Sequence, residues 1–324
     1  MTEFPVSNYS PFVIEWANNN TAVVIVDDTH IRFLSTETKQ ELNSVELPEK
    51  CTVEEISHNN VTNNLLVTFN NSETNQNFAS LYYFSDDFAS IKFVRVGSIN
   101  SWIQAVGQND KFVEVYYVDD KDKEDDGSFI DLFEIIKEGD AITLKEKIHF
   151  EFGGFIEACS PIVLVPDDDT PLPVTFIYAD MDSYMIHWGD GEPGNEVIDP
   201  MEAEPFGVAP CSNTQFFMRY PDNMTSFKTT QEMHSFPLPD PQACIDITSD
   251  GKYMVSATDN GIVTSELMYL ENEKTDVKEI GKLNKSWLEI SGASILKKEN
   301  VLYVCVCVYV SFQKSKAEIY KFDC

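Results

Sequence analysis

The sequence predicts an all-β protein, and three observations on its 324 residues lead to that prediction. Short runs rich in Val, Ile, Phe, Tyr and Thr recur along the chain, bounded by Asn, Asp, Gly and Pro. The spacing of apolar residues that marks a helix is nearly absent. A core is available, because 43% of the residues are hydrophobic and 22 Phe, 13 Tyr and 4 Trp are present. A chain of this length and composition is therefore not an extended disordered polymer.

The predicted strands fall into groups of four that are joined by polar turns. The first three groups are 12–17, 22–27, 31–35 and 42–47; 52–57, 65–70, 80–84 and 91–96; and 102–106, 112–118, 129–135 and 142–150. The next two are 155–165, 173–179 and 183–188, which lacks a fourth strand, and 206–209, 215–219, 224–228 and 231–236. The last two are 243–248, 253–257, 261–267 and 277–283, and the three strands 288–295, 301–310 and 317–322.

The groups repeat at a regular interval. Their first strands start near residues 12, 52, 102, 155, 206, 243 and 288, which matches the ~40–50 residues of a four-stranded propeller blade. Residues 3–7 would supply the missing strand of the last group, since Phe4 and Val6 lie on one side of a strand. We predict a single seven-bladed β-propeller over residues 1–324, with antiparallel blades and a ring closed by pairing of the N-terminal strand with the C-terminal blade. Two stacked β-sandwich domains are the alternative.

One stretch of the sequence carries a family resemblance. Residues 245–261, IDITSDGKYMVSATDNG, combine a strand, an SPDGK-type turn, a strand of small residues and an NG turn. Residues 243–261 therefore resemble the WD40-like β-propeller superfamily in a divergent form. Because the chain has no Gly-His or Trp-Asp pair, the buried hydrogen-bonded tetrad of that family cannot be transferred to it. The resemblance then implies blades that are held mainly by apolar packing.

The charge of the chain restricts its partners. The 54 acidic and 23 basic side chains give a net charge of −31 with no basic patch, so we expect no direct nucleic-acid binding. The longest apolar run, 301–310, is about half of a membrane span, and the first thirty residues lack a secretory signal. We expect an intracellular protein, cytoplasmic or nuclear, without membrane contact and with a monomer favoured.

No motif predicts a metal, a cofactor or a catalytic centre. Five His and seven Cys occur without local pairs of metal-ligand spacing, and Cys305 and Cys307 read as buried apolar residues. The acidic segment 119–126 leaves calcium binding open, although Phe133 stands where an EF-hand needs Glu. There is no GxSxG or phosphate-binding frame. We therefore favour a protein that is not an enzyme, and an enzyme with its active site at the central channel is the alternative.

One acidic stretch predicts the binding site. Between Lys147 and Arg219 the chain has no Lys or Arg but thirteen acidic residues, with aromatic residues among them. Such a field would steer a basic protein surface or a Lys/Arg-rich segment, so we predict a non-catalytic interaction scaffold. The alternative is that the acids only maintain solubility. The predicted partner-binding residues are Asp167, Asp168, Asp169, Asp180, Asp182, Trp188, Asp190, Glu192 and Glu196.

A narrower hypothesis comes from residues 161–188. Their apolar run, acidic triplet, proline-rich strand start and final Trp188 resemble a blade of the acidic N-terminal propeller of mRNA-export nucleoporins. That resemblance covers under thirty residues and implies docking of an RNA helicase through acidic propeller loops.

Overall fold

The protein is described by a computed structural model in which β-strands dominate. The described residues contain no helix. They are 2–3, 13–17, 22–26, 29–59, 64–74, 76–85, 87–96, 101–106, 111–118, 127–138, 141–152, 156–161, 175–180, 183–188, 194–200, 207–212, 215–219, 223–227, 233–238, 240, 243–248, 250–270, 275–311 and 314–324.

The described strands form seven four-stranded antiparallel sheets. The first three sheets contain β2 (Val13–Ala17), β3 (Ala22–Val26), β4 (His30–Ser35) and β5 (Glu41–Glu46); β6 (Cys51–Asn59), β7 (Asn64–Asn71), β8 (Gln76–Phe84) and β9 (Ile91–Val96); and β10 (Ser101–Val106), β11 (Lys111–Val118), β12 (Gly127–Glu138) and β13 (Ala141–Phe152). The next two contain β14 (Ile156–Pro161), β15 (Thr175–Asp180), β16 (Ser183–Trp188) and β17 (Gly194–Pro200); and β18 (Gly207–Ser212), β19 (Gln215–Arg219), β20 (Asn223–Phe227) and β21 (Met233–Pro237).

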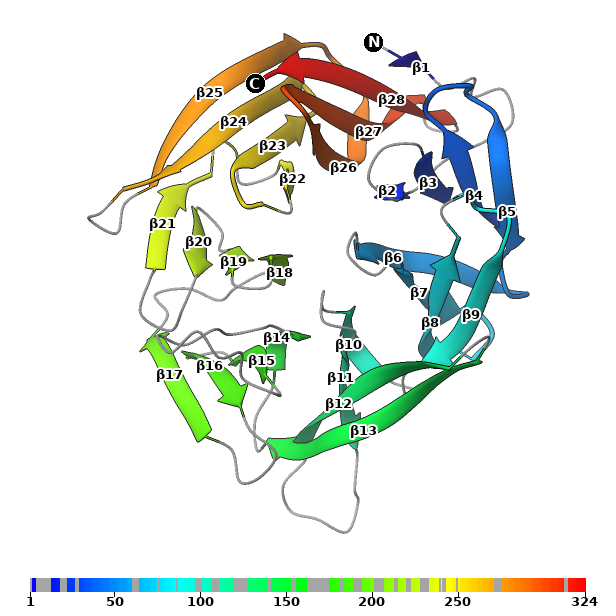
Figure 1. Ribbon diagram of the computed structural model, residues 1–324, viewed down its shortest axis with the longest axis vertical. Helices are drawn as coiled ribbons and strands as arrows, with labels where there is room; N and C mark the ends of the chain where they lie inside the picture. The colour runs from blue at the N-terminus through cyan, green and yellow to red at the C-terminus, as the bar shows by residue number, and fades with distance from the viewer. Residues whose placement is uncertain are drawn as a thin grey trace.

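The last two sheets contain β22 (Cys244–Ile247), β23 (Tyr253–Thr258), β24 (Gly261–Tyr269) and β25 (Thr275–Asn284); and β26 (Glu289–Lys298), β27 (Val301–Ser311), β28 (Lys314–Asp323) and β1 (Thr2–Glu3). The sheets are arranged around a common centre, with the first strand of each group innermost (Figure 1). This all-β arrangement of antiparallel sheets confirms the predicted fold class and is consistent with a β-propeller.

The N-terminal strand joins the C-terminal sheet. Thr2 pairs with Ile319 and Glu3 pairs with Glu318, so β1 lies along the outer side of β28 (Figure 1). Of the predicted closing strand 3–7, only Glu3 lies within the described residues.

The fourth sheet differs from its sequence prediction. Its outer strand β17 was not predicted, and residues 162–165 of the predicted first strand 155–165 lie outside the described residues. The reason lies in composition, because GNEVIDP contains Gly, Asn, Asp and Pro, which disfavour strands in isolation. Pairing with β16, from the pair Trp188 and Gly194 to the pair Ser183 and Pro200, overrides that local preference.

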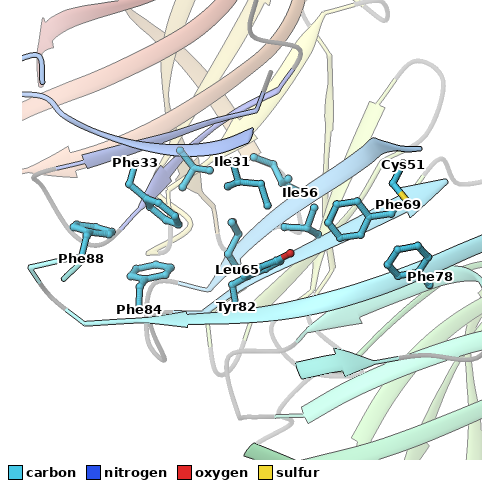
Figure 2. Packing of buried hydrophobic residues seen from close by; sticks show 12 residues of the cluster. Ile31, Phe33, Cys51, Ile56, Leu65, Phe69, Phe78, Tyr82, Phe84 and Phe88 are labelled. Atoms are coloured by element: carbon cyan, nitrogen blue, oxygen red, sulfur yellow. The ribbon is translucent and has the colours of Figure 1, made fainter. Parts of the chain in front are cut away.

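Apolar side chains fill the spaces between neighbouring sheets. Between the sheets of β2–β5 and β6–β9, the rings of Phe33, Phe84 and Phe88 lie with centroids 5.1 to 5.4 Å apart (Figure 2). Phe88 adopts a positive φ of 59°, an unfavourable backbone conformation for a residue with a side chain, yet it is only 1% exposed. Burial of a Phe ring is worth about 1.5–3 kcal/mol, which exceeds the cost of about 1–2 kcal/mol for the left-handed backbone.

The turn that carried the family resemblance is closed by side-chain hydrogen bonds. Thr248 Oγ1 donates a hydrogen bond to Asp250 Oδ1 at 2.7 Å, and Asp250 Oδ1 also accepts one from Lys252 N at 3.2 Å. Gly251 has a φ of 67°, which a glycine adopts without strain. The turn therefore connects β22 to β23 through the Asp and Gly positions that the sequence indicated.

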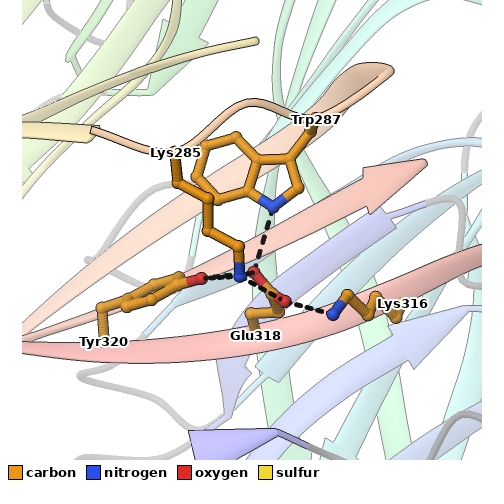
Figure 3. Close-up of polar contacts among 5 residues, drawn as sticks. All are labelled: Lys285, Trp287, Lys316, Glu318 and Tyr320. Atoms are coloured by element: carbon orange, nitrogen blue, oxygen red, sulfur yellow. Dashed lines mark hydrogen bonds and ion pairs between the residues drawn. The ribbon is translucent and has the colours of Figure 1, made fainter. Parts of the chain in front are cut away.

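A buried carboxylate joins the last two sheets. Glu318 on β28 is fully buried and accepts hydrogen bonds from Lys285 Nζ at 2.8 Å to both oxygens and from Trp287 Nε1 at 3.1 Å (Figure 3). Lys316 and the Tyr320 hydroxyl complete its environment. Burial alone would raise the pKa of Glu318, but the bonds from Lys285, Lys316 and Tyr320 outweigh it and lower the pKa to about 2. We call these five residues the Glu318 network.

A second carboxylate connects the inner strands of the same two sheets. Asp246 on β22 accepts from Ile295 N on β26 at 2.7 Å and from Ile247 N at 2.8 Å. Burial raises the pKa of Asp246 to about 6, and these bonds together with one from Ser294 only partly offset it. The last two sheets are thus joined by polar bonds between their inner strands, and Glu318 on β28 binds the segment that connects β25 to β26.

Candidate functional site

The backbone of the fourth sheet defines where the acidic stretch lies. Pro161, Thr175, Trp188 and Gly194 lie at one end of this sheet. Thr175 pairs with Trp188, Trp188 pairs with Gly194, and Pro161 pairs with Phe176, the residue after Thr175. At the opposite end Ile156 pairs with Asp180, and Ser183 pairs with Pro200. We refer to these as the Trp188 end and the Asp180 end of the sheet.

The predicted partner-binding residues divide between these two ends. Asp180, Trp188 and Glu196 lie on described backbone, with Glu196 paired to Ile186 two positions from the Trp188 end. The other six lie outside the described residues: Asp167, Asp168, Asp169, Asp182, Asp190 and Glu192.

The described flanking residues show to which end these six are attached. The segment with Asp167 to Asp169 joins Pro161 to Thr175, and the segment with Asp190 and Glu192 joins Trp188 to Gly194, so both are anchored at the Trp188 end. Asp182 follows the Asp180 end. The predicted residues are therefore divided between the two ends of the sheet, and most of them belong to strands or segments at the Trp188 end.

The acidic stretch begins on β13, where an aromatic stack accompanies it. The rings of Tyr116, Phe129 and His149 are stacked across β11, β12 and β13, with centroid distances of 5.5 and 5.4 Å and interplanar angles of 18°. Glu151 is exposed and lies opposite Phe129 in the register of β12 and β13. Aromatic and acidic groups thus occur together at the start of the stretch.

A carboxylate and an imidazole are paired below this stack. His149 Nδ1 lies 2.6 Å from Asp131 Oδ1, and the side chains are 51% and 10% exposed, respectively. The Tyr116 hydroxyl also bonds to Asp131, and burial together with the charge of Asp131 raises the pKa of Tyr116. We call Tyr116, Phe129, Asp131 and His149 the His149 cluster.

Sequence reasoning missed the His149 cluster. Asp131 and His149 are 18 residues apart, so no local motif joins them. The signal that was available is the hairpin of the predicted strands 129–135 and 142–150, because antiparallel pairing brings positions 131 and 149 opposite each other. Side chains at such positions lie close together on one face of the sheet.

The described residues contain no obvious metal centre or membrane helix. No group of three or more His, Cys, Asp or Glu residues among them is placed to hold a metal ion. Cys305 and Cys307 are both fully buried, as predicted, and burial raises the pKa of Cys307 to about 11. Over the same residues, no helix has the length and apolar character needed to cross a membrane.

Comparison with known proteins identifies the fold and no family. No protein-family model matches the chain, and no curated protein sequence matches it. The chain is similar to the solved structure described as the AfRom2 CNH domain, with a TM-score of 0.56, 9% identity, and coverage of 100% of this chain and 99% of that one. It is also similar to a streptogramin B lyase structure, with a TM-score of 0.56, 13% identity, and coverage of 98% and 97%.

A third similar structure belongs to a crystal structure of the mitotic checkpoint complex, with a TM-score of 0.56, 9% identity, and coverage of 98% of this chain and 92% of that one. These neighbours are propeller-type folds. At such identities the similarity concerns the fold alone, and function must be argued from the site.

Proposed function

We propose that this chain is a non-catalytic interaction scaffold that binds a basic protein surface or a Lys/Arg-rich segment through the acidic stretch from Glu151 to Glu204. One observation carries the proposal: the thirteen acids between Lys147 and Arg219 have no Lys or Arg among them in the sequence. A partner would supply the positive charge that this stretch lacks. Field effects from such a stretch accelerate encounter with a cationic partner and weaken as salt rises.

Some acidic residues elsewhere in the described structure have intramolecular cations. Arg32 contacts Glu41 at 2.8 Å, and Glu134 lies 3.4 Å from Lys111 and 3.3 Å from Lys147. Lys111 and Lys147 lower the pKa of Glu134. This contrast supports a special role for the acidic stretch, because its negative charge is not offset by basic residues of its own sequence.

The proposed platform is a closed seven-bladed propeller. Seven four-stranded sheets and the pairing of Thr2 and Glu3 with β28 support this closure. Within it, the proposed binding surface is the Trp188 end of the fourth sheet, where the segments with Asp167 to Asp169 and with Asp190 and Glu192 attach. Aromatic anchors rimmed by charge are common at interfaces, which makes Trp188 part of the proposal.

A narrower version names an RNA helicase as the partner. It is supported by the resemblance of residues 161–188 to a blade of the acidic propeller of mRNA-export nucleoporins. The fold itself does not choose between a binding protein and an enzyme, since a streptogramin B lyase is among the similar structures. An enzyme with a channel active site is therefore the competing hypothesis.

The test measures partner binding before and after charge reversal. Affinity capture from native lysate at low and high salt should recover a basic protein that salt elutes, and a Lys/Arg-rich peptide should bind with the same salt dependence. Changing Asp167, Asp168 and Asp169 to Lys should abolish both without unfolding the protein. A matched control changes three exposed acids of other sheets, Asp276, Glu279 and Glu289, to Lys. Equal loss in both variants would mean that only net charge matters, and retained binding in the first would refute the assignment.

A further inference from the structure

We propose that Asn260 is a site of spontaneous covalent modification, in which its side chain cyclises onto the Gly261 nitrogen, releases ammonia and leaves aspartate or isoaspartate. Water is the co-reactant. The observation behind this proposal is the hairpin turn between β23 and β24, which contains an exposed Asn-Gly pair and also anchors the segment that links the last two sheets. The proposal goes beyond the interaction function, because it concerns a chemical change in a different part of the molecule.

The first step concerns access to the side chain of Asn260. Thr258 pairs with Gly261, so Asp259 and Asn260 form the loop of the hairpin, and both are exposed. Within the part of the chain that the structure describes, the side-chain amide of Asn260 has no hydrogen-bond partner, and only its backbone groups are bonded. The side-chain carbonyl carbon is therefore open to attack by a neighbouring nitrogen.

The second step concerns the residue that follows Asn260. Glycine has no side chain, so its backbone nitrogen approaches a neighbouring carbonyl carbon with the least steric hindrance. The chain contains no other Asn-Gly pair. The fold requires glycine here, because Gly261 has a φ of 147° and an added Cβ would lie 2.1 Å from the Leu283 carbonyl oxygen. The close approach of β25 to β24 therefore keeps the reactive pair in the chain.

The third step is the reaction itself. The Gly261 nitrogen gives up its proton to hydroxide and attacks the side-chain carbonyl carbon of Asn260, so that a new carbon–nitrogen bond closes a cyclic imide. The bond to the side-chain nitrogen breaks, and this nitrogen takes a proton from water and leaves as ammonia. Water then opens the ring at either carbonyl carbon. Opening at the side-chain carbon gives aspartate, and opening at the main-chain carbon gives isoaspartate.

The fourth step concerns the segment that this turn anchors. Lys285 N donates a hydrogen bond to Asn260 O at 3.3 Å, and Trp287 N donates one to Asp259 O at 2.9 Å. The Asp259 side chain also accepts a hydrogen bond from Ile290 N, at 3.0 Å from its Oδ1 atom. The turn thus fixes the connection between β25 and β26 at three backbone N–H groups.

Isoaspartate changes both the length and the charge of the turn. The main chain then runs through the former side chain and is longer by a methylene group, and the former Asn260 carbonyl becomes a carboxylate beside Asp259, where like charges repel each other. The anchored segment supplies Lys285 and Trp287 to the Glu318 network (Figure 3). We therefore expect the modification to loosen this network and to lower the stability of the protein.

The experiment is incubation of the full chain at pH 8 and 37 °C, followed by trypsin digestion and mass spectrometry at intervals. The peptide 253–274 should gain the mass difference between an oxygen atom and an NH group and should separate into an aspartate and an isoaspartate form. Asn300 is the internal control, because it occupies the corresponding position in the exposed loop between β26 and β27 but precedes Val301. Conversion should be about tenfold faster at Asn260, since Gly261 lacks the β-branched side chain that hinders attack.

A synthetic peptide with the sequence of residues 253–274 sets the rate for this Asn-Gly pair outside the fold. If the peptide converts but Asn260 of the folded chain converts no faster than Asn300, the hairpin protects the site and the proposal is overturned. Conversion of Asn260 in the folded chain at a rate close to that of the peptide would support it.

The structural consequence requires a second readout. Incubated protein should unfold at a lower denaturant concentration than fresh protein. Asn260→Ser keeps a residue that suits turns but cannot form the imide, so its unfolding midpoint should not change on incubation. Asn260→Asp adds the charge without lengthening the main chain, so it should be closer to fresh protein than the isoaspartate form is. If converted and fresh protein unfold at the same denaturant concentration, the turn does not anchor the segment and this part of the proposal is wrong.

Discussion

Glu318 is fully buried and Asp246 is partly buried, and both bind groups at the junction of the last two sheets, yet their surroundings shift their pKa values in opposite directions. Glu318 is surrounded by the two lysines, the tyrosine and the tryptophan of the Glu318 network, and its pKa falls to about 2. Asp246 accepts bonds from two backbone N–H groups and Ser294 but has no cation among these partners, and its pKa rises to about 6. Both are well hydrogen-bonded, so the number of bonds does not explain the difference.

The difference lies in the charge of the donors. Hydrogen bonds from neutral groups satisfy a carboxylate but do not fully replace the water that burial removes. Nearby cations add a Coulomb attraction that is strong where water is excluded. Glu318 is therefore stabilised as a charged group by the fold, whereas Asp246 is held in place at an electrostatic cost.

The largest expected effect comes from removing the charge of Glu318. Glu318→Gln should destabilise the protein by about 3 kcal/mol at neutral pH, because glutamine resembles the protonated form that the network disfavours. Denaturant unfolding should show a lower midpoint. The matched control is Asp323→Asn, a change at an exposed acid on the same strand, which should have almost no effect. Equal stability of Glu318→Gln and the unmodified chain would show that the network does not stabilise the fold.

The next effect concerns the pH dependence of stability, to which Glu318 and Asp246 contribute in opposite directions. The folded pKa of Glu318, about 2, is below its ordinary value of 4.5, so its contribution is present above pH 4.5 and is lost as pH falls toward 2. The folded pKa of Asp246, about 6, is above its ordinary value of 3.8, so stability decreases as pH rises from 3.8 through 6. Asp246→Asn should remove the second slope and keep the first, as measured by unfolding between pH 3 and 7.

The stability of Asp246→Asn at two pH values also tests whether the charge of Asp246 is unfavourable in the folded protein. Asparagine carries no charge but retains one acceptor oxygen, so this variant should be better tolerated at pH 7 than at pH 3.5, relative to the unmodified chain. If the variant is equally destabilised at both pH values, then the hydrogen bond to Ile295 N matters and the charge of Asp246 does not.

Much of the fold could be predicted from local signals. Strand-forming runs such as 301–310 and turn signals such as Ser249 to Lys252 predicted an all-β chain, and antiparallel sheets of a propeller-type fold confirm it. The strand β17 was missed, because its Gly, Asn and Pro residues are poor strand formers and only pairing with β16 makes them a strand. Local propensity therefore fails where tertiary pairing decides.

The polar clusters could not be predicted in the same way. Lys285 and Glu318 are 33 residues apart, and Asp131 and His149 are 18 apart, so their contacts depend on sheet register and on the packing of one sheet against the next. The acidic stretch was visible because it is contiguous in sequence. Its division between the Trp188 end and the Asp180 end follows only from the register of β14 to β17.

A smaller effect is expected from the N-terminal strand, which covers the outer side of the strand that holds Glu318. Deleting the first eight residues removes the pairs Thr2–Ile319 and Glu3–Glu318. The melting temperature should fall by several degrees, since about 1 kcal/mol corresponds to roughly 2–4 °C in a large domain. An unchanged melting curve would show that β1 does not contribute to closure.

The smallest effect is expected from Trp287→Phe, and its comparison with Lys285→Met tests whether a charged donor contributes more than a neutral one in the Glu318 network. Trp287 Nε1 donates to Glu318 at 3.1 Å, and its ring lies 6.4 Å from that of Tyr320 between centroids. Trp287→Phe keeps an aromatic ring and removes one neutral donor, so it should cost about 1 kcal/mol. Lys285→Met removes a cation that bonds to both carboxylate oxygens and should cost more. If the two variants are equally destabilised in the same unfolding assay, donor charge does not explain why Glu318 and Asp246 differ.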